Sequence, residues 1–131
     1  MILSDTSFII ATINIGDKNY IRCRQALLTI RTPFLTTWPC ITEAMHLLDS
    51  QGQETVRQQI ERGVLVLHEC SQDQAVRACT LMRTYADSPM DFADASLVVA
   101  AEETNITRIL TLDNHFYAYR INGTVPFEVL P

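Results

Sequence analysis

Short apolar segments alternate along this chain with longer segments whose apolar residues recur at helical spacing. The short segments are predicted strands and cover residues 1–4, 34–37, 64–68, 108–112 and 126–130. Helices are expected over residues 6–13, 19–31, 42–50, 54–62, 73–85 and 89–104, with Gly52 separating the third from the fourth. This alternation favours a parallel sheet with helices on both faces. Ligands bind such sheets outside the carboxyl ends of the strands, so functional side chains are expected there.

The length and charge of the chain limit the classes of protein to which it could belong. Its 131 residues suit one domain, residues 1–131, with one sizeable core. Hydrophobic residues make up 47% of the sequence, which is typical of a folded protein. The formal net charge of −5 argues against a protein that holds nucleic acid through a broad basic surface. Lys18 is the only lysine, and the other basic residues are arginines, which suit bidentate phosphate contacts but are most often ordinary surface residues.

Cysteine and histidine spacing does not predict a zinc site. The cysteines stand at 23, 40, 70 and 79 without a Cys-x-x-Cys pair, and the histidines stand at 46, 68 and 115. We expect reduced, mostly buried thiols in a cytoplasmic protein. Asp5 interrupts the opening apolar segment, so a signal peptide is not expected. No run approaches the roughly 18 apolar residues of a membrane span.

Asp5 directly follows the first predicted strand and precedes the apolar residues 8–11. A carboxylate in such surroundings needs a partner, because burying it unpaired is costly. Asp5 could cap the following helix or could belong to a functional site, and its position alone does not separate these roles. Ser7 could share either role.

Asp94 is a sharper candidate because of the helix face on which it lies. Residues three, four and seven positions later on that face are Leu97, Val98 and Ala101, so the face should point inward. An ionised side chain is out of place there unless a cation or a dense hydrogen-bond network meets it. A solvated surface position is the alternative, and the apolar pattern disfavours it.

Three further acids have structural interpretations as well as functional ones. Residues 88–91 form a candidate capping box with proline at the first helical position, so Asp91 could cap the helix or support a metal beside Asp94. Asp113 follows the fourth predicted strand and could form a turn or a helix cap. Glu43 is expected to begin the third helix, where its charge suits the helix dipole.

Together these acids are stronger evidence for a functional site than any one of them alone, because a parallel sheet would bring several of them to one edge. Carboxylates that share a cavity repel one another and raise one another's pKa, and a divalent cation removes the conflict. Oxygen ligands without histidine or cysteine favour Mg²⁺ or Mn²⁺ over zinc. The chemistry that follows is phosphodiester hydrolysis, with the metal activating a water and neutralising charge on the phosphate.

The chain resembles the PIN-domain nucleases, and within them the VapC-type toxins of toxin–antitoxin pairs. The resemblance covers essentially the whole chain and rests on LSDTS at residues 3–7, TEA at 42–44, DASLVVAA at 94–101 and ILTLDNHF at 109–116. The last two segments are the most specific. They place an acid at the opening of a small-residue helix, followed by a strand that ends Thr-x-Asp-x-x-Phe.

The resemblance implies a three-layer α/β/α fold with about five parallel strands in the order 3-2-1-4-5. It assigns an acidic quartet to Asp5, Glu43, Asp94 and Asp113. Asp5 and Asp94 are the expected direct metal ligands, Asp113 is a further ligand, and Asp91 could assist or replace Asp94. Ser7 and Thr111 are expected to orient the acids. The resemblance also implies endonucleolytic RNA cleavage with Mg²⁺ or Mn²⁺, a homodimer, and inhibition by a cognate antitoxin protein.

Two other functions were weighed against this hypothesis. An inactive PIN-like module could bind RNA or a protein partner without cleaving anything, although such a module has no need of mutually repelling carboxylates. A haloacid-dehalogenase-type phosphatase needs a second aspartate where this chain has Ser7, and a receiver domain needs a lysine near the last strand. Neither requirement is met.

Overall fold

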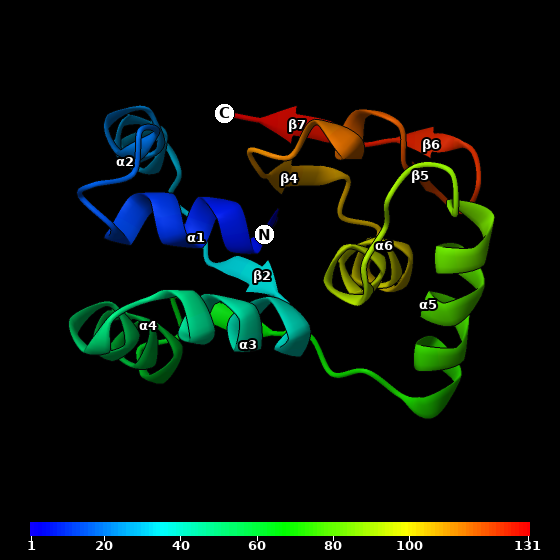
Figure 1. Ribbon diagram of the computed structural model, residues 1–131, viewed down its shortest axis with the longest axis horizontal. Helices are drawn as coiled ribbons and strands as arrows, with labels where there is room; N and C mark the ends of the chain where they lie inside the picture. The colour runs from blue at the N-terminus through cyan, green and yellow to red at the C-terminus, as the bar shows by residue number, and fades with distance from the viewer.

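A five-stranded sheet forms the centre of the protein in the computed structural model, which describes all residues from Met1 to Pro131 (Figure 1). Its strands are β1 (Ile2–Ser4), β2 (Phe34–Thr36), β3 (Leu65–Leu67), β4 (Arg108–Leu110) and β7 (Glu128–Leu130). Their order is β3-β2-β1-β4-β7, and every neighbouring pair is parallel. The predicted order is therefore confirmed. A short antiparallel hairpin of β5 (Arg120–Ile121) and β6 (Val125–Pro126), which the sequence analysis did not predict, precedes the edge strand.

Six α-helices cover the sheet, and their side chains build one apolar core on each face. The helices are α1 (Thr6–Ile13), α2 (Tyr20–Thr29), α3 (Trp38–Leu47), α4 (Ser50–Glu61), α5 (Gln72–Thr84) and α6 (Phe92–Thr104). Side chains alternate between the faces of a strand, and in β1 Ile2 joins the core under α1 to α4 while Leu3 joins the core under α5 and α6. The predicted three layers are present. No helix is long and apolar enough to cross a membrane.

The sequence analysis misplaced several helix boundaries. Helix α3 begins at Trp38, several residues before the predicted start at 42, because Pro39 fits the first helical turn. Gly52 does not separate two helices: its N–H donates to Asp49 Oδ1 at 2.8 Å inside the first turn of α4, which Asp49 caps. Helix α6 begins at Phe92 instead of residue 89.

The cysteines are free, as expected, but only half of them are buried. Cys23 and Cys40 lie in the interior, whereas Cys70 and Cys79 are exposed, so the prediction of mostly buried thiols was wrong for those two. Cys40 belongs to the core beside the site described below, and burial raises the pKa of its thiol to about 12.

Candidate active site

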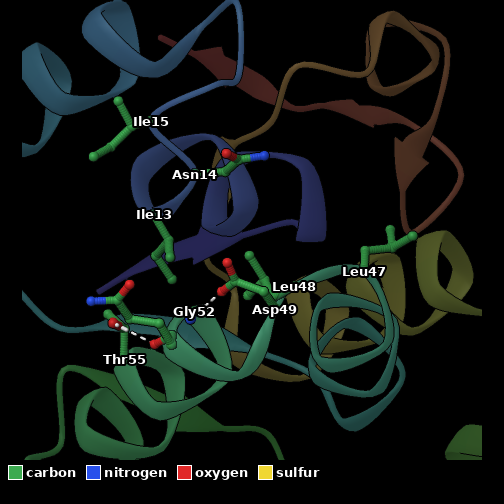
Figure 2. Close-up of a pocket in the computed structure, with 9 residues that line it drawn as sticks. Ile13, Asn14, Ile15, Leu47, Leu48, Asp49, Gly52 and Thr55 are labelled. Carbon is green, nitrogen blue, oxygen red and sulfur yellow. Dashed lines mark hydrogen bonds between the residues drawn. The ribbon is translucent and has the colours of Figure 1, made fainter.

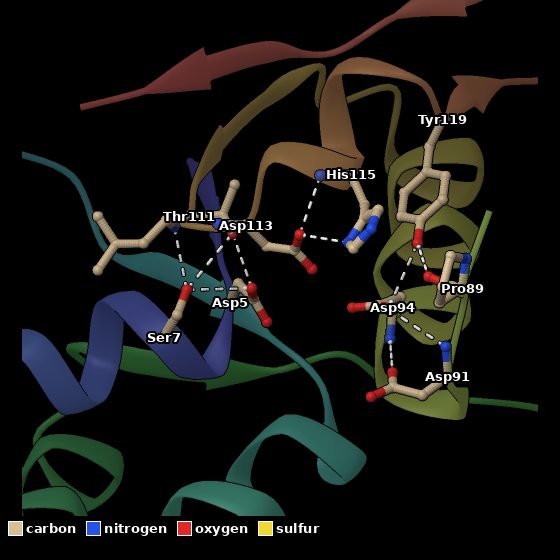
Figure 3. Close-up of polar contacts among 10 residues, drawn as sticks. Asp5, Ser7, Pro89, Asp91, Asp94, Thr111, Asp113, His115 and Tyr119 are labelled. Atoms are coloured by element: carbon tan, nitrogen blue, oxygen red, sulfur yellow. Dashed lines mark hydrogen bonds and ion pairs between the residues drawn. The ribbon is translucent and has the colours of Figure 1, made fainter.

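A cavity of about 330 Å³ opens at the carboxyl ends of β1 and β4, where the topology places ligands. The acids that line it are Asp5, Asp17, Glu43, Asp91, Asp94 and Asp113. All five acids singled out in the sequence therefore reach one cavity, together with Asp17, which the sequence analysis missed. Figure 3 shows the Asp5 and Asp113 side chains near the strand ends and the Asp91 and Asp94 pair on α6.

Asp5 is held rigidly by the residues around it. It directly follows β1, caps α1 by accepting from the Thr6 N–H at 2.7 Å, and accepts from Thr111 Oγ1 at 2.7 Å and Ser7 Oγ at 3.2 Å. The cap that was one alternative for Asp5 is present, and Ser7 and Thr111 contact it as expected (Figure 3). Burial raises the pKa of Asp5 to about 6, although these hydrogen bonds oppose the rise.

Asp94 takes part in a capping box at the start of α6. Asp91 is the N-cap and accepts from the Asp94 N–H at 2.8 Å, and the Asp94 carboxylate accepts from the Asp91 N–H at 3.2 Å. The box therefore spans residues 91–94, not 88–91, and Asp91 is a cap as one alternative predicted. Asp94 is buried, and burial together with the Asp91 charge raises its pKa to about 7. The charges of Asp5 and Asp113 add to the rise, so these acids repel one another.

Tyr119 contacts Asp94 through its hydroxyl and was not predicted from the sequence. Its hydroxyl donates to the Pro89 carbonyl at 2.6 Å and lies 3.5 Å from Asp94 Oδ2 (Figure 3). The ring is fully buried and packs edge-on against Phe116 and Tyr85. Nothing in the local sequence marks this tyrosine, because its partner lies on a different element 25 residues earlier.

Asp113 lies after β4 and caps a short 3₁₀ helix, Asn114–Tyr117. Its Oδ1 accepts from the His115 N–H at 2.9 Å and lies 2.7 Å from His115 Nδ1. The Asp113 N–H in turn donates to Thr111 Oγ1 at 3.0 Å, so Thr111 links Asp113 to Asp5. The cap predicted for Asp113 is present, and the histidine contact is an addition to the predicted site.

Glu43 differs from the other acids in being exposed and without hydrogen bonds. The sequence analysis placed it at the start of a helix, but it lies in the middle of α3 because that helix begins at Trp38. The dipole argument for Glu43 was therefore wrong. Its side chain still lines the acidic cavity, and no cap or ion pair accounts for that position.

The carboxylates fit a hard divalent cation bound through few protein ligands. No three His, Cys, Asp or Glu side chains are arranged so that they could hold a metal ion by themselves. Mg²⁺ needs only one or two carboxylates, because it keeps several waters and binds substrate phosphates. Ionisation of the buried Asp5 and Asp94 carboxyls destabilises the folded protein. A bound cation would compensate both charges. The donor set contains only oxygens and suits Mg²⁺ or Mn²⁺.

A second cavity, of about 490 Å³, lies where the end of α1 meets the corner between α3 and α4 (Figure 2). Its lining includes Ile13, Ile15 and Leu47, and its only acid is Asp49, which caps α4. This cavity lacks titratable groups free for catalysis. The titratable side chains gather instead in the acidic cavity.

A parallel sheet covered by helices on both faces, with an acidic cavity at its carboxyl edge, defines a class of proteins that could bind a divalent cation beside a phosphate. Comparison with known proteins identifies the family: the PIN domain model matches residues 2–122. The chain therefore belongs to the PIN domain family, which confirms the family named from the sequence.

Individual relatives share the fold at low sequence identity. Over 132 aligned residues the chain is 24% identical to Ribonuclease VapC26 of Mycobacterium tuberculosis, covering 97% of this chain and 98% of that protein. VapC20 of the same organism, a Sarcin-Ricin loop cleaving toxin, superposes with a TM-score of 0.85 at 18% identity, covering 96% and 100% of the two chains. A toxin-antitoxin complex from Klebsiella pneumoniae gives a TM-score of 0.67 at 21% identity, covering 100% and 97%.

Proposed function

We propose that this chain is an endoribonuclease that hydrolyses RNA phosphodiester bonds with Mg²⁺ or Mn²⁺, and that it is the toxin of a toxin–antitoxin pair. The observation that carries the proposal is that Asp5, Asp94 and Asp113, from three separate elements, line one cavity at the carboxyl edge of the sheet. Two similar proteins support it by name, one a ribonuclease and the other a toxin that cleaves RNA.

Each acid has a role that follows from its surroundings. Asp5 and Asp94 would hold the cation, because both are buried and fixed by hydrogen bonds. Asp113 would bind through the oxygen that His115 leaves free, and Asp91 positions Asp94 through the capping box. Glu43, exposed and unpaired at the cavity, would orient the attacking water. A bound Mg²⁺ or Mn²⁺ supplies an acidified water and neutralises charge on the phosphate.

The proposal includes partners and a compartment. We expect a homodimer, an RNA substrate, and an antitoxin protein that covers the active site, in the cytoplasm. The Klebsiella pneumoniae neighbour, whose match covers 100% of this chain and 97% of its own, is a toxin–antitoxin complex and supports the antitoxin. The free thiols agree with a reducing compartment.

Cleavage of RNA by the purified protein tests the proposal. We expect total RNA to be cut in the presence of Mn²⁺ or Mg²⁺ and left intact when EDTA removes the metal, because no ion then acidifies the attacking water. Zn²⁺ is expected to support cleavage poorly, since the site offers no histidine or cysteine ligand. Equal cleavage with EDTA and with Mn²⁺ would contradict the metal-dependent mechanism.

The alternative of an inactive binding module is separated by calorimetry with Mn²⁺. An active site of this kind should bind the ion at millimolar concentration or below and give a measurable heat of binding. That heat of binding should be lost in Asp94→Asn. Failure of the wild-type protein to bind Mn²⁺, together with intact RNA, would favour the module.

Thr111→Val is expected to lower cleavage about 10- to 100-fold, because loss of a residue that orients a ligand has effects of that size. Valine keeps the shape of threonine but removes the hydroxyl that donates to Asp5 at 2.7 Å and accepts from the Asp113 N–H. Rates at saturating Mn²⁺ and the Mn²⁺ concentration for half-maximal rate measure the change. Thr124→Val, at an exposed threonine whose hydroxyl makes no hydrogen bond, should cleave like wild type. Equal cleavage rates for the two variants would show that Thr111 does not contribute to the active site.

A further inference from the structure

A groove of about 650 Å³ continues the acidic cavity along the junction of α3 and α6. Glu43 and Asp91 line both the cavity and the groove, so the two are continuous. The groove also carries two exposed aromatic side chains, Trp38 at 61% exposure and Phe92 at 44%. Both lie in the first turn of their helices, and α3 packs against α6 there. Exposed aromatics beside an active site are available for stacking.

A smaller cavity of about 230 Å³ opens on the far side of these aromatics. Trp38, Pro39 and Phe92 line both this pocket and the groove, so they form a shared rim. The pocket lies between the ends of β2 and β3 and the first turns of α5 and α6. Its volume is below the roughly 300–1,000 Å³ of pockets for drug-sized ligands, which suits a single flat ring system.

His68 is the one polar side chain of this pocket that has no partner. It follows β3, is 9% exposed, and its imidazole makes no hydrogen bond to the protein. The hydroxyls of Thr37 and Ser96, by contrast, pair with each other at 2.6 Å. Burial lowers the pKa of His68, so at neutral pH its ring offers one donor and one acceptor. The pocket itself exposes no polar surface, so it suits the apolar face of a flat ring and not a polar edge.

The charges of the groove restrict which part of RNA could bind there. No lysine or arginine lines the groove, the pocket or the acidic cavity. Phosphates beyond the metal therefore find no cation, and a sugar–phosphate chain cannot be held by charge. The aromatic rings instead offer stacking, which is the contact that a base exposed from a strand can make.

We infer that the rim of Trp38 and Phe92 stacks one nucleobase of the RNA substrate, and that the ring of this base enters the apolar pocket behind the rim. The inference rests on the proposed function and adds to it a base-binding subsite beside the acidic cavity. Continuity of pocket, groove and acidic cavity favours a nucleic acid over a protein occupant, because one strand could reach from rim to carboxylates. Binding at this rim should depend weakly on salt.

Trp38 is the only tryptophan in the chain, so its fluorescence reports the rim alone. The probes are hexameric oligo(A), oligo(C), oligo(G) and oligo(U), titrated in EDTA so that no cleavage occurs, with a self-complementary RNA hexamer duplex as control. We expect quenching by at least one single-stranded oligomer, little quenching by the duplex, and a midpoint that salt moves little. Unchanged emission with every oligomer, in a protein that cleaves RNA with Mn²⁺, would overturn the inference and leave the proposed function standing. Quenching without any cleavage would support the inference and contradict the proposed function.

Variants separate stacking from a structural effect. By anisotropy of a labelled oligomer, Trp38→Ala should weaken binding about 5- to 150-fold, the effect of losing one stacked base, and Trp38→Phe should restore most of it. Leu28→Ala, at a 78% exposed leucine on α2 that lines none of these cavities, should bind like wild type. Equal binding by Trp38→Ala and wild type would overturn the stacking.

A second copy of the chain is the competing occupant of the rim. If it covered Trp38, the emission of the free protein would shift on dilution, and Trp38→Ala would turn a dimer into a monomer in sedimentation. That result would overturn the inference. Emission independent of protein concentration, with the same oligomeric state in Trp38→Ala and wild type, would support an open rim.

Discussion

Asp94→Asn is expected to lower RNA cleavage about a thousand-fold or more, because metal-derived charge stabilisation contributes several kcal/mol to such reactions. The amide keeps the size of the carboxylate and its oxygen can still accept from the Asp91 N–H, so the capping box should persist. The change removes one buried charge of the cavity and weakens its hold on the cation. Cleavage of a labelled RNA with Mn²⁺, read by gel, measures the loss, and expression of the variant should no longer inhibit growth.

Asp73→Asn is the matched control for this variant. Asp73 also lies in the first turn of a helix, α5, but it is exposed and lines none of the cavities described above. The same change of charge and atoms there should leave cleavage at the wild-type rate. If purified Asp94→Asn still cut RNA as fast as Asp73→Asn, the acidic cavity would not be the active site.

The sequence predicted Asp5 and Asp94 because each conflicts with its local surroundings, whereas Glu43 and Asp113 were assigned by the resemblance. Asp5 and Asp94 lie among apolar residues, and that conflict is visible without a structure. Topology supplied their convergence, since parallel strands end at one edge of the sheet. Tyr119 and Asp17 escaped prediction because their roles come from packing against distant elements, which leaves no local pattern.

Helix starts were less predictable than the sheet, for a related reason. A β-branched run such as residues 64–68 is bounded on both sides, so β3 was found within one residue of each end. A helix start depends on which of several polar residues takes the capping position, and Asp49 and Asp91 prevailed over Gly52 and Ser88. The β5–β6 hairpin was missed because its strands have only two residues each.

The same acids should make the metal-free protein less stable as pH rises. The pKa of Asp5 is about 6 and the pKa of Asp94 about 7 in the folded protein, whereas the usual pKa of an aspartate is 3.8. Between the usual pKa and the raised pKa values, the folded protein holds protons that the unfolded chain has released. The free energy of unfolding therefore falls with increasing pH in this range. The stabilisation is complete below about pH 4 and lost above about pH 7. A pKa difference of one between the folded and unfolded states is worth about 1.4 kcal/mol, so we expect the pair to lose several kcal/mol of stability.

Urea denaturation in EDTA, from about pH 5 to about pH 7.5, measures this loss, and Asp94→Asn isolates the contribution of one carboxyl. Other titrating groups are common to wild type and variant, so the difference between their slopes reports Asp94. The variant should be the more stable protein at the upper end of the range, although it is inactive, whereas Asp73→Asn should follow wild type. Parallel pH profiles for Asp94→Asn and wild type would contradict the buried, repelling arrangement.

Adding Mn²⁺ at about pH 7.5 should reverse the loss in wild type, since an ion that binds only the folded state stabilises it by about 2.7 kcal/mol at a hundred times its dissociation constant. Asp94→Asn should gain much less from the same ion, because one of its ligands is neutral. That result would show that the wild-type cavity trades stability of the metal-free protein for binding of the ion. A wild-type protein whose stability ignored Mn²⁺ would show that these carboxylates coexist for some other reason.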